Sequence, residues 1–348
     1  MRSIVFLGNR KLELREFPDP TPGPGEVVIQ IKASGMCGSD LKFYRAAGNE
    51  AAALGLGGTG GPVIAGHEPC GIIAAVGPSV TDTEAWVGQR VMNHHYKGCG
   101  QCKYCRQGWS QLCPKGIVVF GVTGDGAHAP YMKVPARTNV PLPEELSFEE
   151  GAAVSCGTGT AYGALKRLDV SGRDTLAVFG QGPVGLSATM LGRAMGARVI
   201  AVDIHDERLA LAKEFGAETV INSKDADPVA AIKQLTHGEG AETTMDCTGI
   251  AEARLAAVRS AATWGRVAFV GEGGATTFDI SADLIRKQLT LVASWTFSAI
   301  GQWECARFIA DRKIPLLRLL TDRFKLEQAE EAYRRFDTQT TGKGVFVF

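Results

Sequence analysis

The sequence predicts an α/β protein with two domains, a β-rich barrel-like domain followed by a doubly wound parallel sheet. The chain has 348 residues, and at about 150 residues per domain this length suits two domains. Short apolar runs separated by Gly and Pro occupy the N-terminal part, as in small barrels. From about residue 174, apolar runs alternate with helical stretches, which predicts parallel strands joined by helical crossovers.

The N-terminal part carries strand-like runs at Val27–Ala33, Cys70–Val76 and Gln89–Asn93, and a turn-rich PDPTPGPGE stretch precedes the first of them. The pattern changes near Ser147, which we expect to cap a helix because Glu150 follows three residues later. The Gly- and Ala-rich segment 46–61 is expected to be a loop.

The second part contains six expected strands with helices between them. The strands are expected at 175–180, 198–203, 218–222, 243–248, 266–271 and 289–295. The helices are expected up to about 195 and at 206–215, 228–236 and 251–262. A helix near 300–311, an amphipathic stretch at 326–336 and a terminal VFVF strand follow. This order predicts a doubly wound sheet, whose ligands bind at the carboxyl ends of the strands.

Composition excludes several classes of protein. Basic and acidic side chains number 37 each, and this balance argues against partners such as nucleic acid or a membrane surface. No apolar run approaches the length of a membrane helix, and the N-terminus lacks a signal-peptide pattern. We therefore expect a cytoplasmic protein. Its nine cysteines then suggest metal ligands or buried thiols, since disulfides are rare in that compartment.

A glycine triplet, Gly180-x-Gly182-x-x-Gly185, follows the first strand of the expected parallel sheet and opens a helix. The first glycine permits a tight turn, the second allows close approach of a pyrophosphate, and the third lets helix and strand pack. Pro183 and Val184 begin the helix, whose free N–H groups favour a phosphate. The alternative is a glycine-rich helix start in some other α/β protein.

Asp203 ends the next strand, at the position where a carboxylate binds both ribose hydroxyls of NAD and repels a 2′-phosphate. The residues that follow it, IHDE, add acidic groups and no adjacent arginine. The sequence therefore favours NAD over NADP.

Four cysteines, Cys99, Cys102, Cys105 and Cys113, lie within GCGQCKYCRQGWSQLCP. Four thiolates at this spacing can enclose a tetrahedral Zn²⁺ and leave no open position, which makes a structural site. A ferredoxin-like iron–sulfur run also ends in Cys-Pro, but its last gap is three residues rather than seven. The few basic residues nearby disfavour a nucleic-acid zinc ribbon.

A second group of potential ligands is dispersed. Cys37 lies in SGMCGSD, His67 in AGHEPCG and Cys156 in SCGTGT, each beside glycines or other small residues. Taken one at a time, each has a simpler explanation: free cysteines are most often buried thiols, and a lone histidine is more often a core residue with its hydrogen bonds satisfied.

In order along the chain, Cys37-Gly-Ser-Asp40, Gly66-His67-Glu68, the four-cysteine lobe, Cys156 and the glycine loop together resemble the zinc-dependent medium-chain alcohol dehydrogenase family. The resemblance covers essentially the whole chain. It implies a GroES-like catalytic domain at 1–156 and 297–348, with the zinc lobe at about 95–115. A Rossmann coenzyme domain is implied at 157–296, with a cleft between the two domains.

The resemblance implies two zinc ions per chain, one catalytic and one structural. Cys37, His67 and Cys156 match the protein ligands of the catalytic zinc, and Glu68 matches a carboxylate that can approach that metal. Asp40 matches the acceptor that orients His67, which fixes its tautomer and raises its basicity. Cys156 resembles the classical alcohol dehydrogenases, whereas CGSD resembles polyol and butanediol dehydrogenases.

The mechanism implied by the resemblance is hydride transfer from an alcohol to nicotinamide, with zinc as a Lewis acid at the substrate oxygen. Ser39 matches the hydroxyl that takes the substrate proton. Lys42 stands where the family often has a histidine that ends the proton relay. Either water completes the relay, or Lys42 takes part in it, and we expect Lys42 to contact the cofactor or a polar substrate. Thr160 matches a threonine beside the nicotinamide.

Strand ends near Thr248, Gly271 and Ser294 are expected to line the cofactor site. His95 matches a substrate-pocket position, where an imidazole would favour a second polar group on the substrate. The alternative is a strand histidine bonded to the backbone.

These matches predict an NAD-dependent enzyme acting on a secondary alcohol, diol or small polyol and its ketone. A member directed at primary alcohols and aldehydes is the alternative, and a non-catalytic NAD- or zinc-binding protein is a more distant one. By analogy with the family we expect a homotetramer, with a homodimer as the alternative.

Overall fold

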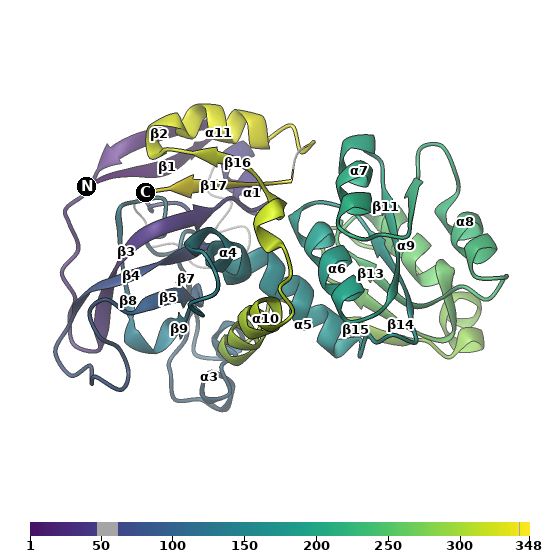
Figure 1. Ribbon diagram of the computed structural model, residues 1–348, viewed down its shortest axis with the longest axis horizontal. Coiled ribbons are helices and arrows are strands. Elements are labelled where there is room, and N and C mark those ends of the chain that lie inside the picture. Colours follow the sequence, from purple (N-terminus) through teal and green to yellow (C-terminus); the bar gives the residue numbers. More distant parts are fainter. Residues whose placement is uncertain (47–61, 341) are drawn as a thin grey trace. The chain divides into compact units, whose positions relative to one another are not determined.

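The computed structural model describes residues 1–46, 62–340 and 342–348. Most of the loop expected at 46–61 lies outside the described residues. The chain divides into two compact units (Figure 1). The first contains Met1–Gly159, Ser298–Gln339 and Lys343–Phe348, and the second contains Thr160–Phe297. The α/β fold class predicted from the sequence is confirmed.

The first unit is built mainly of strands. They are β1 (Arg2–Gly8), β2 (Lys11–Glu16), β3 (Glu26–Gly35), β4 (Pro69–Val76), β5 (Arg90–Asn93), β6 (Tyr96–Lys97), β7 (Val118–Val119), β8 (Tyr131–Pro135), β9 (Asn139–Pro141), β16 (Leu320–Phe324) and β17 (Lys343–Val347). Its helices are α1 (Asp40–Arg45), α3 (Lys103–Arg106), α4 (Phe148–Ala153), α10 (Ala299–Asp311) and α11 (Ala329–Phe336).

The main sheet of this unit runs in the order β16-β17-β3-β4-β5-β9, and β8 also pairs with β3. The last strands therefore lie beside an early one, as the yellow and purple arrows of Figure 1 show. The core beneath α11 contains Ile4, Met36, Tyr44, Tyr333 and Phe346, so it joins the two ends of the chain. This return of the chain supplies side chains to the candidate site described below.

The second unit is a six-stranded sheet in the order β12-β11-β10-β13-β14-β15, with every neighbouring pair parallel. Its strands are β10 (Thr175–Phe179), β11 (Arg198–Asp203), β12 (Thr219–Asn222), β13 (Ala241–Asp246), β14 (Ala261–Phe269) and β15 (Thr290–Ala293). Its helices are α5 (Gly159–Arg167), α6 (Pro183–Ala194), α7 (Asp206–Glu214), α8 (Pro228–Leu235) and α9 (Ala251–Ser260).

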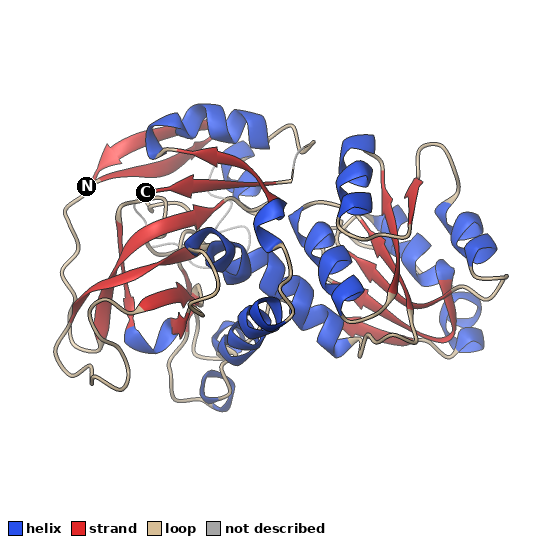
Figure 2. Ribbon diagram, in the orientation of Figure 1, coloured by secondary structure: helices blue, strands red, loops and turns tan. Residues whose placement is uncertain are grey.

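Helices cover both faces of this sheet (Figure 2). The order reverses between β10 and β13, so the crossovers through α6 and α7 and those through α8 and α9 lie on opposite faces. Phe179, Ile200, Val202 and Val267 belong to the core that these layers enclose. Such a reversal opens a binding crevice at the carboxyl ends of β10 and β13.

Local sequence rules account for several boundaries. Ser147 caps α4 in a capping box, in which its hydroxyl accepts the N–H of Glu150 at 3.2 Å and the Glu150 carboxylate accepts the N–H of Ser147 at 2.9 Å. β14 begins at Ala261 rather than near 266 as predicted. Trp264, which has a left-handed backbone conformation, and the Gly265 that follows it interrupt the apolar pattern without ending the strand.

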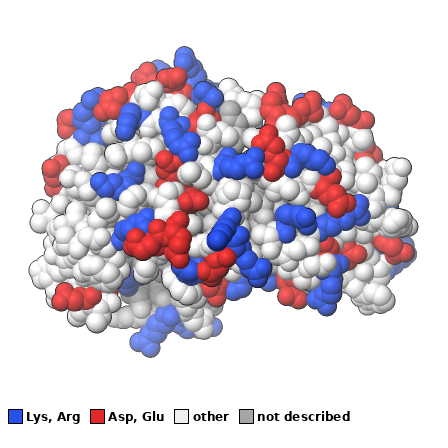
Figure 3. Space-filling view, viewed as in Figure 1, with Lys and Arg blue, Asp and Glu red and all other residues white. Residues whose placement is uncertain are grey.

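The surface carries both charge signs. On the face shown in Figure 3, Lys and Arg are interspersed with Asp and Glu and do not form one extended field of a single sign. In the part of the chain that the structure describes, no helix has both the length and the apolar character needed to cross a membrane.

Candidate active site

Pairing of β3 with β4 brings two of the predicted ligands together. Ser34 is in register with Pro69, and the Gly35 N–H then donates to the Glu68 carbonyl at 3.1 Å. Cys37 therefore follows the end of β3 at the same edge where His67 precedes β4. The loop after β3 is closed by Asp40, whose Oδ2 accepts the Cys37 N–H at 2.8 Å.

Cys156 joins Cys37 and His67 from a helical segment in which the hydrogen-bond pattern changes from α to π. Between α4 and α5 the segment Val154–Thr158 forms a π-helical turn, a feature frequent at functional sites. The hydroxyl of Ser155 donates to the carbonyl of Pro69 at 2.9 Å, which ties this turn to the residue that follows Glu68. On its other side, Gln302 of α10 donates to the Ser155 hydroxyl at 3.2 Å.

The four side chains that converge here have the composition of a metal site. One ligand atom from each of Cys37, His67, Glu68 and Cys156 lies within 4.8 Å of all the others. The sulfurs of Cys37 and Cys156 are 3.9 Å apart. With Zn–S bonds of about 2.3 Å, two sulfurs of a tetrahedral zinc site lie about 3.8 Å apart. The geometry and the N/S donor set therefore fit a zinc ion.

The electrostatics also favour a bound cation. The thiol of Cys156 donates a hydrogen bond that lowers the pKa of Cys37, and His67 lowers it further, against the opposing effect of burial. The same hydrogen bond and burial raise the pKa of Cys156. Burial lowers the pKa of His67, but Asp40 and Cys37 outweigh it and raise that pKa above its usual value. A metal would replace these shared protons.

The carboxylate of Asp40 lies against the ring of His67, and its role in orienting that ring remains a prediction. Its Oδ1 is 2.9 Å from Nδ1 of His67, and both side chains are buried. This leaves Nε2 as the ring atom for a metal. The hydroxyl of Ser39 lies 3.1 Å from that Nε2, so Ser39 is also at the site.

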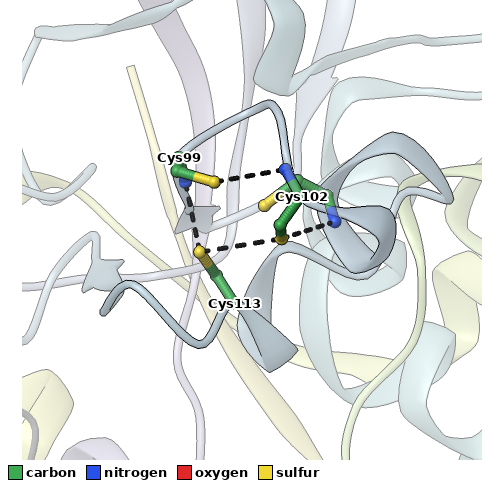
Figure 4. Close-up of side chains that lie close together, drawn as sticks. Cys99, Cys102 and Cys113 are labelled. Carbon is green, nitrogen blue, oxygen red and sulfur yellow. Dashed lines mark hydrogen bonds between the residues drawn. The ribbon is translucent and has the colours of Figure 1, made fainter.

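The four-cysteine lobe is a second ligand cluster, with its sulfurs within 4.8 Å of one another. Figure 4 shows Cys99, Cys102 and Cys113 close together in this lobe. The sulfurs of Cys102 and Cys113 are 3.9 Å apart. The N–H groups of Gln101 and Cys102 lower the pKa of Cys99 to about 6. Backbone donors that stabilise thiolate suit a structural zinc.

The glycine loop of the second unit joins β10 to α6. Gly180 has φ +87°, a left-handed conformation that favours glycine. A Cβ on Gly185 would lie 1.7 Å from the carbonyl oxygen of Gly180, so this helix packs too closely for any side chain. Pro183 is the first residue of α6 and Val184 the second. The loop N–H of Gln181 donates to Oδ2 of Asp203 at 2.5 Å.

Comparison with known proteins gives the family. The profile described as "Alcohol dehydrogenase GroES-like domain" matches residues 23–144, and that described as "Zinc-binding dehydrogenase" matches residues 183–311. An uncharacterized zinc-type alcohol dehydrogenase-like protein of Escherichia coli K12, YphC, is 41% identical over 352 residues, which cover 100% of this chain and 99% of the relative. The chain belongs to the zinc-dependent medium-chain alcohol dehydrogenase family.

Other members of this family are similar over nearly their whole length. The sorbitol dehydrogenase of Bacillus subtilis 168 is 30% identical over 338 residues, 96% of this chain and 93% of the relative. The solved structure of alcohol dehydrogenase TADH from Thermus sp. ATN1 superposes with a TM-score of 0.90 at 28% identity, covering 100% of this chain and 99% of the other.

In this oxidoreductase the remaining predicted residues lie as follows. Thr248, Gly271 and Ser294 follow the carboxyl ends of β13, β14 and β15. Thr160 lies at the start of α5 and is buried. Lys42 lies in α1 and is half-buried. The roles assigned to these five residues remain predictions.

His95 is buried with its ring centroid 5.2 Å from that of His67. Its Nδ1 lies 2.9 Å from the carbonyl oxygen of Ser155, so it makes the backbone bond of the alternative interpretation. Burial, together with the nearby His67, lowers the pKa of His95 and keeps its imidazole neutral. Its contact with substrate remains a prediction.

Two residues near these sites carried no signal in the sequence. Lys343 of β17 is buried, with Nζ 2.5 Å from Oε2 of Glu68 and 3.0 Å from the carbonyl of Met36. Burial raises the pKa of Glu68 to about 8, against the effect of this lysine. Arg208, five residues after Asp203, has its Nη1 3.9 Å from Oδ2 of that aspartate.

Proposed function

We propose that this chain catalyses the reversible, NAD-dependent oxidation of a secondary alcohol, diol or small polyol to a ketone. The observation that carries this proposal is the convergence of Cys37, His67 and Cys156 with Glu68 on one point. Three N/S ligands leave a zinc with a position for substrate, which is the layout of a catalytic site.

When bound, zinc supplies Lewis acidity at the substrate oxygen, and NAD accepts the hydride. The chain's own residues do the rest. Asp40 holds His67 in one tautomer and orientation. We propose that Ser39, whose hydroxyl lies 3.1 Å from Nε2 of His67, accepts the proton of the substrate hydroxyl while it passes its own proton outward. Lys42 lies in α1, five residues after Cys37, and is proposed to contact the cofactor or a polar substrate.

An NAD-coupled screen tests the substrate class. Secondary alcohols, diols and sugar alcohols are compared with primary alcohols of matched carbon number, by the rate of NADH formation. We expect the highest kcat/KM among the secondary alcohols or polyols, because His95 adds a polar group beside the metal cluster. Preference for primary alcohols would favour the alternative family function. NAD and zinc binding without turnover on any of them would favour a non-catalytic role.

NAD is the proposed cofactor because backbone hydrogen bonds fix the carboxylate of Asp203 at the position that a ribose would contact. Its Oδ1 accepts the N–H groups of Ile204 at 2.7 Å and His205 at 3.0 Å, while Oδ2 accepts the N–H of Gln181. This anchored carboxylate can accept the 2′- and 3′-hydroxyls and repels a 2′-phosphate. Arg208 beside it could pair with a 2′-phosphate only if the carboxylate were absent.

Replacement of Asp203 by alanine should therefore invert the preference. We expect kcat/KM with NAD to fall about 10- to 100-fold, the loss of hydrogen bonds to a charged group, while NADP gains. Steady-state rates with both cofactors give the ratio. In the double variant Asp203→Ala, Arg208→Ala the gain with NADP should disappear. Equal use of both cofactors by the unaltered protein would contradict the assignment.

The proposed zinc content is two ions per chain, one in each cluster. The proposed location is the cytoplasm, where reduced thiols can hold them. A homotetramer, or otherwise a homodimer, is proposed because β15 is an edge strand and Trp264, Ile285 and Leu291 of the second unit are exposed. Exposed edges with large apolar side chains favour pairing. Light scattering on the purified protein would contradict this by giving a monomer mass.

A further inference from the structure

A continuous row of close polar contacts leads away from the candidate zinc ligand His67 through the interior of the first unit. Beyond Asp40, whose Oδ1 holds His67, Oδ2 of the same carboxylate lies 3.2 Å from the hydroxyl of Tyr333 in α11. That hydroxyl is 2.7 Å from Nε2 of His128, and Nδ1 of His128 is 2.8 Å from the hydroxyl of Ser34 in β3. All five side chains are buried.

The chemistry of these groups sets the direction of the bonds. The phenol of Tyr333 has one proton, and Asp40 as a carboxylate can only accept. If Tyr333 donated to His128 instead, its lone pairs would face the Asp40 oxygen at 3.2 Å. In the favourable order, the Ser34 hydroxyl donates to Nδ1 of His128 and Nε2 of His128 donates to the Tyr333 hydroxyl. The Tyr333 hydroxyl then donates to Oδ2 of Asp40. Burial lowers the pKa of His128 to about 4, so this histidine is neutral, as the order requires.

We propose that Tyr333 and His128 are positioning residues that extend the Asp40–His67 pair and hold Nε2 of His67 toward the catalytic zinc. This inference rests on the proposed function, because it requires zinc at the first cluster. Asp40 Oδ2 has two donors, the Cys37 N–H at 2.8 Å and the Tyr333 hydroxyl. Without the second donor, the carboxylate is fixed by a single bond on that side and can rotate away from His67.

The packing around Tyr333 makes the hydroxyl removable without disturbing the ring. Its ring lies 4.8 Å from that of Phe6 in an edge-on arrangement and 5.5 Å from that of Tyr44. Phenylalanine fills the same space. Tyr44 belongs to the same buried cluster, and within the described residues no hydrogen bond joins its hydroxyl to Asp40. Tyr44→Phe is therefore the matched control for Tyr333→Phe.

The first experiment measures zinc affinity, with the holoenzyme titrated against a chromophoric chelator near neutral pH. The four-cysteine lobe serves as an internal reference in every sample. For Tyr333→Phe we expect the zinc of the first cluster to bind about 10-fold more weakly, the lower end of the effect of outer hydrogen-bond partners. The lobe zinc should be unchanged. Tyr44→Phe should hold both ions as the unaltered protein does.

A second pair of variants separates hydrogen bonding from packing. His128→Gln keeps an N–H donor for Tyr333, whereas His128→Phe keeps a ring but no donor. We expect the phenylalanine variant to weaken the first zinc and the glutamine variant to restore its affinity. The absorption bands of the cobalt-substituted enzyme report the same ligand geometry and should shift in Tyr333→Phe alone of the two tyrosine variants.

The outcomes distinguish the inference from the proposed function. Two zinc ions in the unaltered protein, with equal affinity in Tyr333→Phe and Tyr44→Phe, would overturn the inference and leave the proposed function standing. A single ion in the unaltered protein, held by the lobe, would overturn both. If Tyr333→Phe does not fold, the order of the two His128 variants decides: equal affinity in both overturns the inference.

Discussion

Replacement of Cys37 by alanine is expected to remove one of two zinc ions and to lower hydride transfer at least about 1000-fold. The variant keeps His67, Glu68 and Cys156, but the cluster loses one of its two sulfurs, which lie 3.9 Å apart. Lewis-acid stabilisation is worth several kcal/mol, and each 1.36 kcal/mol in the barrier is tenfold in rate. Zinc per chain by mass spectrometry and the NADH-forming rate give the two readouts.

Two variants control for this loss. Cys305→Ala removes a buried thiol that belongs to neither cluster and should retain both ions. Cys99→Ala should lose the lobe zinc and keep the zinc of the first cluster. Full activity in Cys37→Ala, or loss of the lobe zinc in place of the other, would contradict the assignment of the catalytic site.

Gly182→Ala and Gly185→Ala are expected to give different defects, although the two glycines lie three residues apart. The first should weaken NAD binding and the second should lower the free energy of unfolding. At Gly185 a Cβ would meet the Gly180 carbonyl oxygen at 1.7 Å, and backbone cannot move aside cheaply. Overpacking of this kind lowers the free energy of unfolding by about 3 kcal/mol. The second unit of Gly185→Ala should therefore have a lower melting temperature than that of the unaltered protein, whether or not NAD is present.

Gly182→Ala should instead leave the stability of the cofactor-free protein within about 0.5 kcal/mol. Gly182 has φ −71°, which any residue adopts, and a Cβ there would meet only Arg208 Nη2 at 3.9 Å. The expected defect is weaker NAD binding, because the Cβ occupies the space needed by the pyrophosphate. Thermal melting and calorimetric titration with NAD separate the two cases. Normal NAD affinity in Gly182→Ala would remove this loop from the cofactor site.

The features that sequence reasoning predicted correctly depend on neighbours along the chain. The Ser147–Glu150 capping box spans one helical turn, and the alternation of strands and helices after 174 is a pattern of local periods. The convergence of Cys37, His67 and Cys156 came from family resemblance, since no spacing rule joins residues so far apart. The structure supplies the physical link, in the β3–β4 register and the Ser155–Pro69 hydrogen bond.

The residues that the sequence did not reveal have distant partners. Lys343 meets Met36 across 307 positions and Tyr333 meets Asp40 across 293. A lone lysine in a terminal strand or a tyrosine on an amphipathic helix carries no mark of such a contact, because only the folded topology brings them together. The π-helical turn at Cys156 was equally hidden, since its residues fit an ordinary helix.

The pairing of β17 with both β16 and β3 has a consequence for biosynthesis. The lobe cysteines lie close together in the chain, so that site can take up its ion early. The first cluster reaches its final surroundings only when β17 and α11 have left the ribosome, on the order of tens of seconds after β3 at about 5–20 residues per second. The second unit, which is encoded between them, can be complete by then. The first cluster should therefore secure its ion later than the four-cysteine lobe does.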